Sequence, residues 1–132
     1  HLLTKKSAAI VNVSSGLAFV PFPASPIYSA TKSGIHAYSQ ILRLQLKNTS
    51  VKVFELAPPG TDTPLNEKLG TEMDKNQLMK VDKMVCIAIK GLLKDKYEIR
   101  PGLANLLKWG SRIAPKFFLN FLNRTIQNAK KK

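Results

Sequence analysis

Apolar residues follow two different spacings along the first half of the chain. Two short runs, residues 7–13 and 51–56, are rich in β-branched and aromatic side chains, as strands are. Between them, from about Tyr28 onward, apolar residues recur every three or four positions on two stripes, which is typical of a helix buried on two sides. The order strand, helix, strand predicts a right-handed crossover between parallel strands, with the first strand buried on both faces.

The second half of the chain continues with helical and strand-like segments. We expect a helix, a brief strand and two further helices over residues 81–94, 97–100, 103–110 and 115–128. The first of these helices is expected to bury Met84, Val85, Ala88, Ile89 and Leu92. Gly110 is expected to end the next helix and Pro115 to begin the last one, whereas the polar stretch 65–80 is uninformative. The whole pattern predicts an α/β fold with a three-stranded parallel sheet.

Length and composition allow one modest hydrophobic core, because the chain has 132 residues of which 44% are apolar. The sequence holds no apolar run of about 18 residues, the length needed to cross a bilayer. Its first residues also lack the layout of a signal peptide, so a cytoplasmic location is expected.

Two residues of types that often carry chemistry are interpreted as structural. Cys86 lies in an apolar run and is expected to be buried, reduced and inert, with a reactive thiol as the less favoured alternative. His36 has no carboxylate, cysteine or second histidine at ligand spacing, which favours a structural or surface histidine. No metal site is predicted.

The net charge of +13 is concentrated near the end of the chain, where eight lysines and arginines and no acidic residue follow Glu98. A solvated basic face is favoured over attraction to an anionic partner. The apolar stripe of the last helix consists of Phe117, Phe118, Phe121, Leu122 and Ile126. We expect this stripe to pack on protein, and a peripheral membrane contact is the less favoured alternative. Nucleic-acid binding is not expected, because the basic residues are not interleaved with exposed aromatic ones.

Candidate catalytic chemistry centres on Tyr28 and Lys32. Because they are four residues apart at the start of a helix, one helical turn places both side chains on the same face. A nearby ammonium favours the phenolate, so Tyr28 is a candidate general acid/base. Ser15 lies thirteen residues before Tyr28, at the end of the first strand, where its hydroxyl can hold a substrate oxygen. Ligands bind outside the carboxyl ends of strands in sheets of this kind.

The loop after the second strand completes a recognisable pattern. It reads Ala57-Pro58-Pro59-Gly60-Thr61-Asp62-Thr63. A serine, a Tyr-x-x-x-Lys pair thirteen residues later and a Pro-Gly-x-x-x-Thr loop further on resemble the short-chain dehydrogenase/reductase family. The resemblance covers roughly residues 1 to 100, and the segments Ser15–Phe19 and Ala57–Pro59 are most similar to its DltE-like branch, named after D-alanylation loci.

The resemblance implies an oxidoreductase that moves hydride between NAD or NADP and a carbonyl or alcohol substrate. Tyr28 would be the general acid/base, Lys32 its activator and a ligand of the nicotinamide ribose, and Ser15 the residue that orients the substrate oxygen. The residues implied to contact the cofactor are Tyr28, Lys32, Pro58, Thr61 and Thr63. Pro59 stands where the family usually has glycine, which removes an amide donor from the loop.

Features that normally bind the dinucleotide phosphates do not occur in this sequence, since no Gly-x-Gly-x-x-Gly segment follows a strand. Residues 1–102 are therefore expected to be the C-terminal half of a doubly wound, Rossmann-type sheet, and residues 103–132 an appended basic, amphipathic helical tail. The isolated chain is expected to be inactive and poorly soluble or partly unfolded. A homo-oligomer is expected through the second apolar stripe of the helix after Tyr28. The alternative function is a non-catalytic interaction module that retains the fold.

Overall fold

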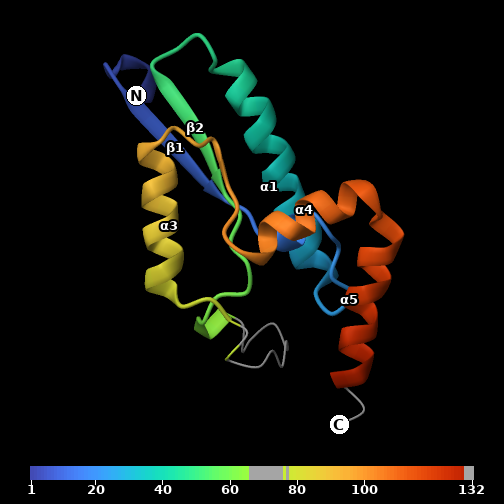
Figure 1. Cartoon of the computed structure of the whole chain (residues 1–132). Helices are drawn as coiled ribbons and strands as arrows, with labels where there is room; N and C mark the ends of the chain where they lie inside the picture. Colours follow the sequence, from blue (N-terminus) through green and yellow to red (C-terminus); the bar gives the residue numbers. More distant parts are fainter. Residues whose placement is uncertain (66–75, 77, 130–132) are drawn as a thin grey trace.

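A computed structural model of the chain describes residues 1–65, 76 and 78–129, without the side chains of residues 125, 126, 128 and 129. Most of the uninformative stretch 65–80 therefore lies outside the described residues. The strands form a parallel sheet in the order β1 (Ala8–Val13), β2 (Val51–Leu56) and β3 (Glu98–Ile99). This confirms the predicted α/β class and the three-stranded parallel sheet. Figure 1 shows β1 and β2 side by side.

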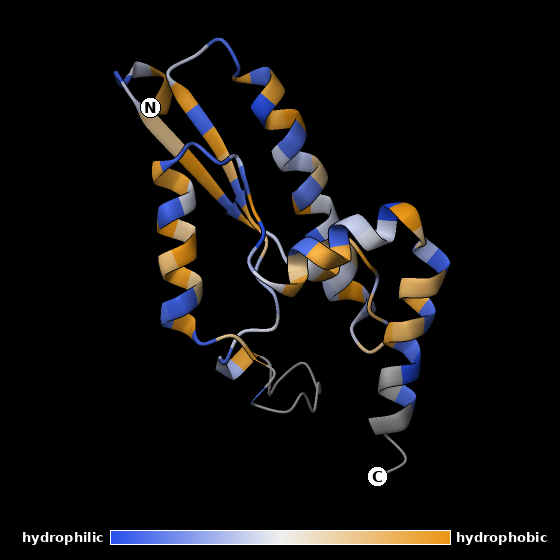
Figure 2. Ribbon diagram, viewed as in Figure 1, coloured by the Kyte–Doolittle hydropathy of each residue, from blue (hydrophilic) through white to orange (hydrophobic). Residues whose placement is uncertain are grey.

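Two long helices cover opposite faces of the sheet (Figure 1). Helix α1 (Pro26–Gln45) connects β1 to β2, and α3 (Val81–Leu93) precedes β3. On β2, Glu55 points toward α1, where it meets His36, while Leu56 packs against Ala88 of α3. Apolar and polar residues alternate along both helices, as amphipathic helices require (Figure 2).

Strand β1 is less buried than the sequence predicts. Its residues alternate between half-buried and exposed, and Val11 and Val13 are 43% and 48% exposed. The expectation of burial on both faces is wrong for this strand, because within the described residues it pairs only with β2 and is packed chiefly on its α1 side. The side chains of Val11 and Val13 therefore lie on a face of β1 that no described element covers closely.

Helix α3 presents a different face to the sheet from the one predicted. Met84, Ala88 and Leu92 belong to the core cluster as expected, together with Ile87. In contrast, the side chains of Val85, Cys86 and Ile89 are exposed, so their predicted burial is wrong. Residues two apart on a helix point in nearly opposite directions, and with Ala88 against the sheet, Cys86 faces outward.

The tail forms two helices, α4 (Leu103–Ile113) and α5 (Pro115–Ala129), that pack on each other. Gly110 does not end α4 as predicted, because the helix continues through it to Ile113. The break falls at Ala114, which precedes Pro115 and has a non-helical backbone (φ −139°, ψ 64°), since proline disfavours a helical residue before it. Phe118 and Leu122 are partly buried.

Phe117 and Phe121, which belong to the same predicted apolar stripe of α5, are not buried. Phe117 and Phe121 stack on each other and remain exposed. The side chain of Ile126 lies outside the described residues. Across the part of the chain that the structure describes, no helix is both long and apolar enough to cross a bilayer.

Candidate functional site

Ser15 lies where β1 ends and the chain turns. The backbone N–H of Ser14 donates to Leu56 O (2.8 Å) and that of Gly16 to Pro58 O (2.8 Å), so the ends of β1 and β2 stay side by side. The Ser15 hydroxyl accepts a hydrogen bond from the Leu17 amide (3.1 Å) and caps a short 3₁₀ helix, η2 (Gly16–Ala18). This cap holds the Ser15 side chain at the carboxyl end of the sheet.

Gly16 allows the tail to approach this turn. A Cβ atom at Gly16 would lie 3.2 Å from the Cβ of Ala104 and 3.3 Å from its Cα. Because that contact includes backbone, α4 could not pack so closely on a larger residue. Helix α4 of the tail therefore lies directly beside the turn that carries Ser15.

Tyr28 and Lys32 lie in the first two turns of α1. Pro26 begins the helix, which suits a residue without an amide hydrogen. The Lys32 ammonium lies 5.6 Å from the centre of the Tyr28 ring and donates to Val13 O (2.9 Å). The structure therefore has the two side chains on one face of the helix, with the ammonium tied to the end of β1.

The loop after β2 is held by its own hydroxyl groups and by a short bridge. The Thr61 hydroxyl donates to Pro59 O (3.0 Å), and the Thr63 hydroxyl donates to Thr61 O (3.3 Å). The Met79 amide donates to Gly60 O (2.9 Å) and the Asp62 amide to Met79 O (3.0 Å). These bonds position the loop over the same end of the sheet as Ser15.

All six residues that the sequence singles out border one cavity of about 290 Å³, which is close to the lower limit for small-molecule sites. They are Ser15, Tyr28, Lys32, Pro58, Thr61 and Thr63. Much of the remaining wall is apolar and comes from Leu17, Phe22, Met84, Leu103, Leu107 and Leu122. The arrangement combines a phenol, an ammonium and hydroxyl groups with an apolar surround, which suits proton transfer to an oxygen on an apolar small molecule.

Sequence reasoning missed a buried polar network beside this cavity. The Glu55 side chain is completely buried, and its carboxylate accepts from the Ser14 hydroxyl (2.5 Å) and meets His36 Nδ1 (2.8 Å). The prediction that His36 is structural fits this contact, but the carboxylate partner was missed because it belongs to another element. The one signal in the sequence was an acidic residue, Glu55, placed between the apolar residues Phe54 and Leu56 in the central strand.

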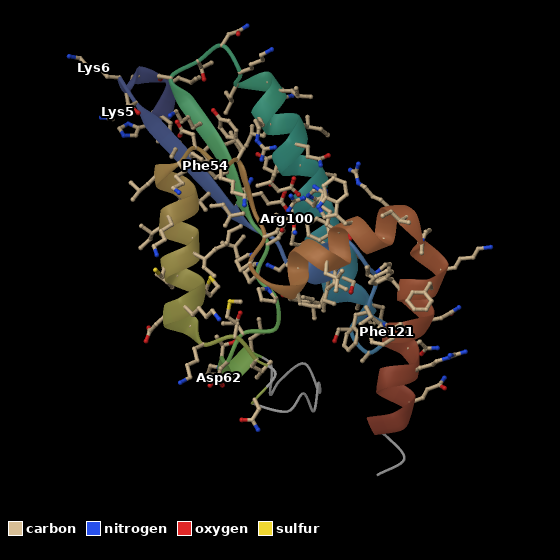
Figure 3. The ribbon with its side chains drawn as sticks, in the orientation of Figure 1. Lys5, Lys6, Phe54, Asp62, Arg100 and Phe121 are labelled. Carbon is tan, nitrogen blue, oxygen red and sulfur yellow. The ribbon has the colours of Figure 1, made fainter. Side chains whose placement is uncertain are left out.

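A second carboxylate, Glu98 of β3, lies close to this network. It forms an ion pair with Lys108 of α4 and lies 3.5 Å from Arg100 Nη1. Figure 3 shows Arg100 in the polar region between the sheet and α4. Burial works against ionisation of Glu98, but the hydrogen bond from Lys108 and the charges of Lys108 and Arg100 outweigh it and lower the Glu98 pKa.

Ligand atoms of His36, Glu55 and Glu98 lie within 4.8 Å of one another, a spacing at which three such groups can hold a metal ion. The donor atoms are already engaged: His36 and Ser14 bind Glu55, while Lys108 binds Glu98. Lys108 and Arg100 also place two positive charges beside the site, which opposes binding of a cation. The group is accounted for as a network of hydrogen bonds and ion pairs.

Comparisons with known proteins agree with this arrangement. The family model described as short chain dehydrogenase matches residues 1–74. An uncharacterized oxidoreductase of Bacillus subtilis (strain 168), DltE, is 45% identical over 103 residues, which cover 75% of this chain and 40% of that protein.

Solved structures show the same fold. A short chain dehydrogenase from Burkholderia cenocepacia J2315 in complex with NADP has a TM-score of 0.72 at 22% identity, covering 88% of this chain and 47% of that one. A short-chain dehydrogenase from Sphingobium yanoikuyae in complex with NADPH has a TM-score of 0.67 at 29% identity, covering 84% and 44%. The chain thus spans less than half the length of each of these relatives.

Proposed function

The chain belongs to the short-chain dehydrogenase/reductase family, and we propose that it supplies the catalytic side of an oxidoreductase acting on a small carbonyl or alcohol compound. The observation that carries the proposal is the shared cavity. Tyr28 and Lys32 enter it from one helix face and Ser15 enters it from the end of the adjacent strand. The two solved structures of similar fold described above contain bound NADP and NADPH, which supports NAD or NADP as the cofactor of this protein.

The chemistry divides among three side chains. During reduction of a carbonyl, the Tyr28 phenol gives its proton to the substrate oxygen, and during oxidation of the alcohol it takes the proton back. The Lys32 ammonium lies beside the ring and stabilises the phenolate that remains after proton donation. The Ser15 hydroxyl donates to the same substrate oxygen and fixes its position.

The cofactor's nicotinamide, when bound, supplies or accepts the hydride. Lys32 has three N–H donors and uses one for Val13 O, which leaves donors for ribose hydroxyls. Tyr28 borders the same space, and Pro58, Thr61 and Thr63 line it on the side of the β2 loop. These residues fit the nicotinamide end of the cofactor.

We further propose that the catalytic part, residues 1–102, is the C-terminal half of a longer enzyme whose preceding half binds the dinucleotide phosphates. The tail, residues 103–132, completes the wall of the cavity through Leu107 and Leu122. The protein containing both halves is called the full-length enzyme below. Its expected location is the cytoplasm.

A homo-oligomer is proposed from the outward face of α1. Gly34, Ala37, Ile41 and Leu44 are exposed there, and no Cβ contact would form within 4 Å of Gly34. Small and apolar residues on one helix face permit close packing with a second copy. For the tail, packing on protein remains favoured over a membrane contact, because Phe118 and Leu122 are already partly buried.

The proposed activity is tested by replacing Tyr28 with phenylalanine in the full-length enzyme. Tyr28→Phe removes the transferable proton and is expected to lower kcat by about 10²- to 10⁴-fold with little change in cofactor affinity. Turnover is followed by nicotinamide absorbance with a panel of ketones and aldehydes, and cofactor affinity by nicotinamide fluorescence.

Tyr38→Phe is the matched control, because Tyr38 lies on the same helix but on its exposed face. It should leave turnover unchanged. Undiminished turnover in Tyr28→Phe would refute the role of Tyr28. Failure of the full-length protein to bind nicotinamide cofactors would instead favour a non-catalytic interaction module.

A further inference from the structure

The completely buried Glu55 carboxylate is not used by the proposed reaction. It lies on the central strand β2 and faces α1. The Ser14 hydroxyl donates to Oε1 (2.5 Å), and His36 Nδ1 lies 2.8 Å from Oε2 and 3.0 Å from Oε1. A buried carboxylate is costly unless it is paired, so these two contacts account for its presence at this position.

Both partners of Glu55 are direct neighbours of proposed catalytic residues. Ser14 is the residue before Ser15 on the chain, and its own side chain is buried. His36 follows Lys32 by four residues, which places the two on the same face of α1, one turn apart. Glu55 therefore connects the strand end that carries Ser15 with the helix face that carries Lys32 and Tyr28.

Two further hydrogen bonds join β1 and α1 at other positions along the strand. Lys32 Nζ donates to Val13 O (2.9 Å), and Asn12 Nδ2 donates to Ser39 Oγ (3.0 Å). Hydrogen bonds specify direction and distance, whereas apolar packing does not. The α1-facing side of β1 is thus held to the helix by polar contacts, and the Ser14–Glu55–His36 link is the one next to Ser15.

The surroundings of the link are charged but balanced. Glu98 of β3, Arg100 just after β3 and Lys108 of α4 lie in the same region, and the charges of Lys108 and Arg100 compensate that of Glu98. The Phe19 ring, in the turn after Ser15, packs edge-on against His36 with centroids 5.0 Å apart. His36 therefore contacts both Glu55 and the turn that carries Ser15.

We propose that Glu55 is a positioning residue of this site. Through Ser14 and His36, it sets the distance between Ser15, just after β1, and the helix face of α1 that carries Tyr28 and Lys32. The inference rests on the proposed function. Misplacement of a catalytic group by about 1 Å can lower a rate by about 10²-fold, so loss of this link should lower kcat rather than cofactor affinity.

Three variants of the full-length enzyme test the proposal, and a fourth is a substitute for the first. Glu55→Met has a similar shape but no hydrogen-bonding oxygen, and it breaks both contacts. Glu55→Gln keeps them, because its amide oxygen can accept from Ser14 and its NH₂ can donate to His36. Asp95→Asn makes the same carboxylate-to-amide change at a remote, exposed ion pair with Lys52 and is the matched control. Ser14→Ala breaks the link from the strand side and replaces Glu55→Met if that variant does not fold.

Two readouts are measured for each variant. Steady-state kinetics with a ketone and whichever of NADH and NADPH the wild-type enzyme uses give kcat and the KM of each reactant, including the cofactor. Amide hydrogen exchange reports on Ser14 and Gly16, whose N–H groups bond to Leu56 O and Pro58 O. In Glu55→Met we expect kcat to fall by about 10- to 100-fold, with nearly unchanged cofactor affinity. We also expect these amides to exchange about tenfold faster, because the strand end opens more often. Glu55→Gln should retain most of the wild-type kcat, and Asp95→Asn all of it.

The outcomes separate this inference from the proposed function. Wild-type kcat and wild-type exchange in Glu55→Met would overturn it, as would an equal loss of kcat in Glu55→Gln and Glu55→Met. If the wild-type enzyme transfers no hydride, the proposed function fails. Faster exchange at Ser14 and Gly16 would then still support the positioning of the strand end by Glu55, and unchanged exchange would overturn it.

Discussion

At the residue scale, Glu98 links the fold to pH. Its pKa in the folded protein lies below the ordinary value of 4.5, because Lys108 and Arg100 outweigh the effect of burial. A depressed carboxyl pKa contributes stability that is present above the ordinary pKa and is lost as pH falls through the folded pKa. We expect Glu98→Gln to lower the unfolding free energy of the full-length enzyme by about 2 kcal/mol at pH 7, by loss of a charge-assisted hydrogen bond.

The difference in unfolding free energy between wild type and Glu98→Gln should begin to shrink as pH falls below 4.5, where Glu98 of the unfolded chain becomes protonated. It should be lost once pH falls through the lower pKa of Glu98 in the folded protein. Urea unfolding followed by circular dichroism at several pH values measures this. Asp95→Asn is the control: its ion pair with Lys52 is about half exposed and should contribute only about 0–1 kcal/mol. The prediction would be contradicted if Glu98→Gln and Asp95→Asn lowered the unfolding free energy by the same amount at every pH.

At the element scale, Gly110 determines how α4 meets α5. A Cβ atom at this position would overlap the Phe118 ring, so the glycine permits close contact of the two helices. In an isolated helix Gly→Ala is stabilising by about 1 kcal/mol. Here the clash should dominate, and we expect Gly110→Ala to destabilise the full-length enzyme by about 1–3 kcal/mol in urea unfolding.

Phe118→Leu provides the control for Gly110→Ala, because a smaller side chain relieves the overlap. In the Phe118→Leu background, Gly110→Ala should cost less than it does alone, and the difference is the coupling free energy of the two positions. Additive effects would show that Gly110 does not act through Phe118.

At the scale of the whole molecule, the uncovered edge of the sheet decides how the chain behaves alone. Val11 and Val13 are exposed on β1, and no described strand pairs with its outer edge. Unpaired edges and exposed apolar surface favour aggregation. We expect the isolated 132-residue chain to lack a cooperative thermal transition and to bind neither NADH nor NADPH. The full-length enzyme should unfold cooperatively and bind at least one of the two cofactors.

Calorimetry and titration of nicotinamide fluorescence measure these two properties on the same samples. Cooperative unfolding of the monomeric chain would disprove the first expectation. Saturable binding of NADH or NADPH by the chain alone would show that the preceding half is not required for cofactor binding.

Much of the fold follows from local patterns in the sequence. The β-branched runs became β1 and β2, and the helical spacing after Tyr28 became α1. The four-residue separation of Tyr28 and Lys32 places both on one face of that helix, since helical geometry alone relates them. The position of Ser15 at the end of a strand was predicted from the end of an apolar run in the sequence.

The tertiary structure decided the features that depend on contacts between distant segments. The orientation of α3 on the sheet leaves Cys86 exposed. Gly110 was expected to end a helix, but it lies inside α4, where the absence of a side chain makes room for the Phe118 ring. The pairing of β2 beside β1, with α1 across both, brought Glu55 to Ser14 and His36. Local periodicity determines which elements form, but helix rotation and strand order determine which side chains meet, because those depend on packing between elements far apart in the chain.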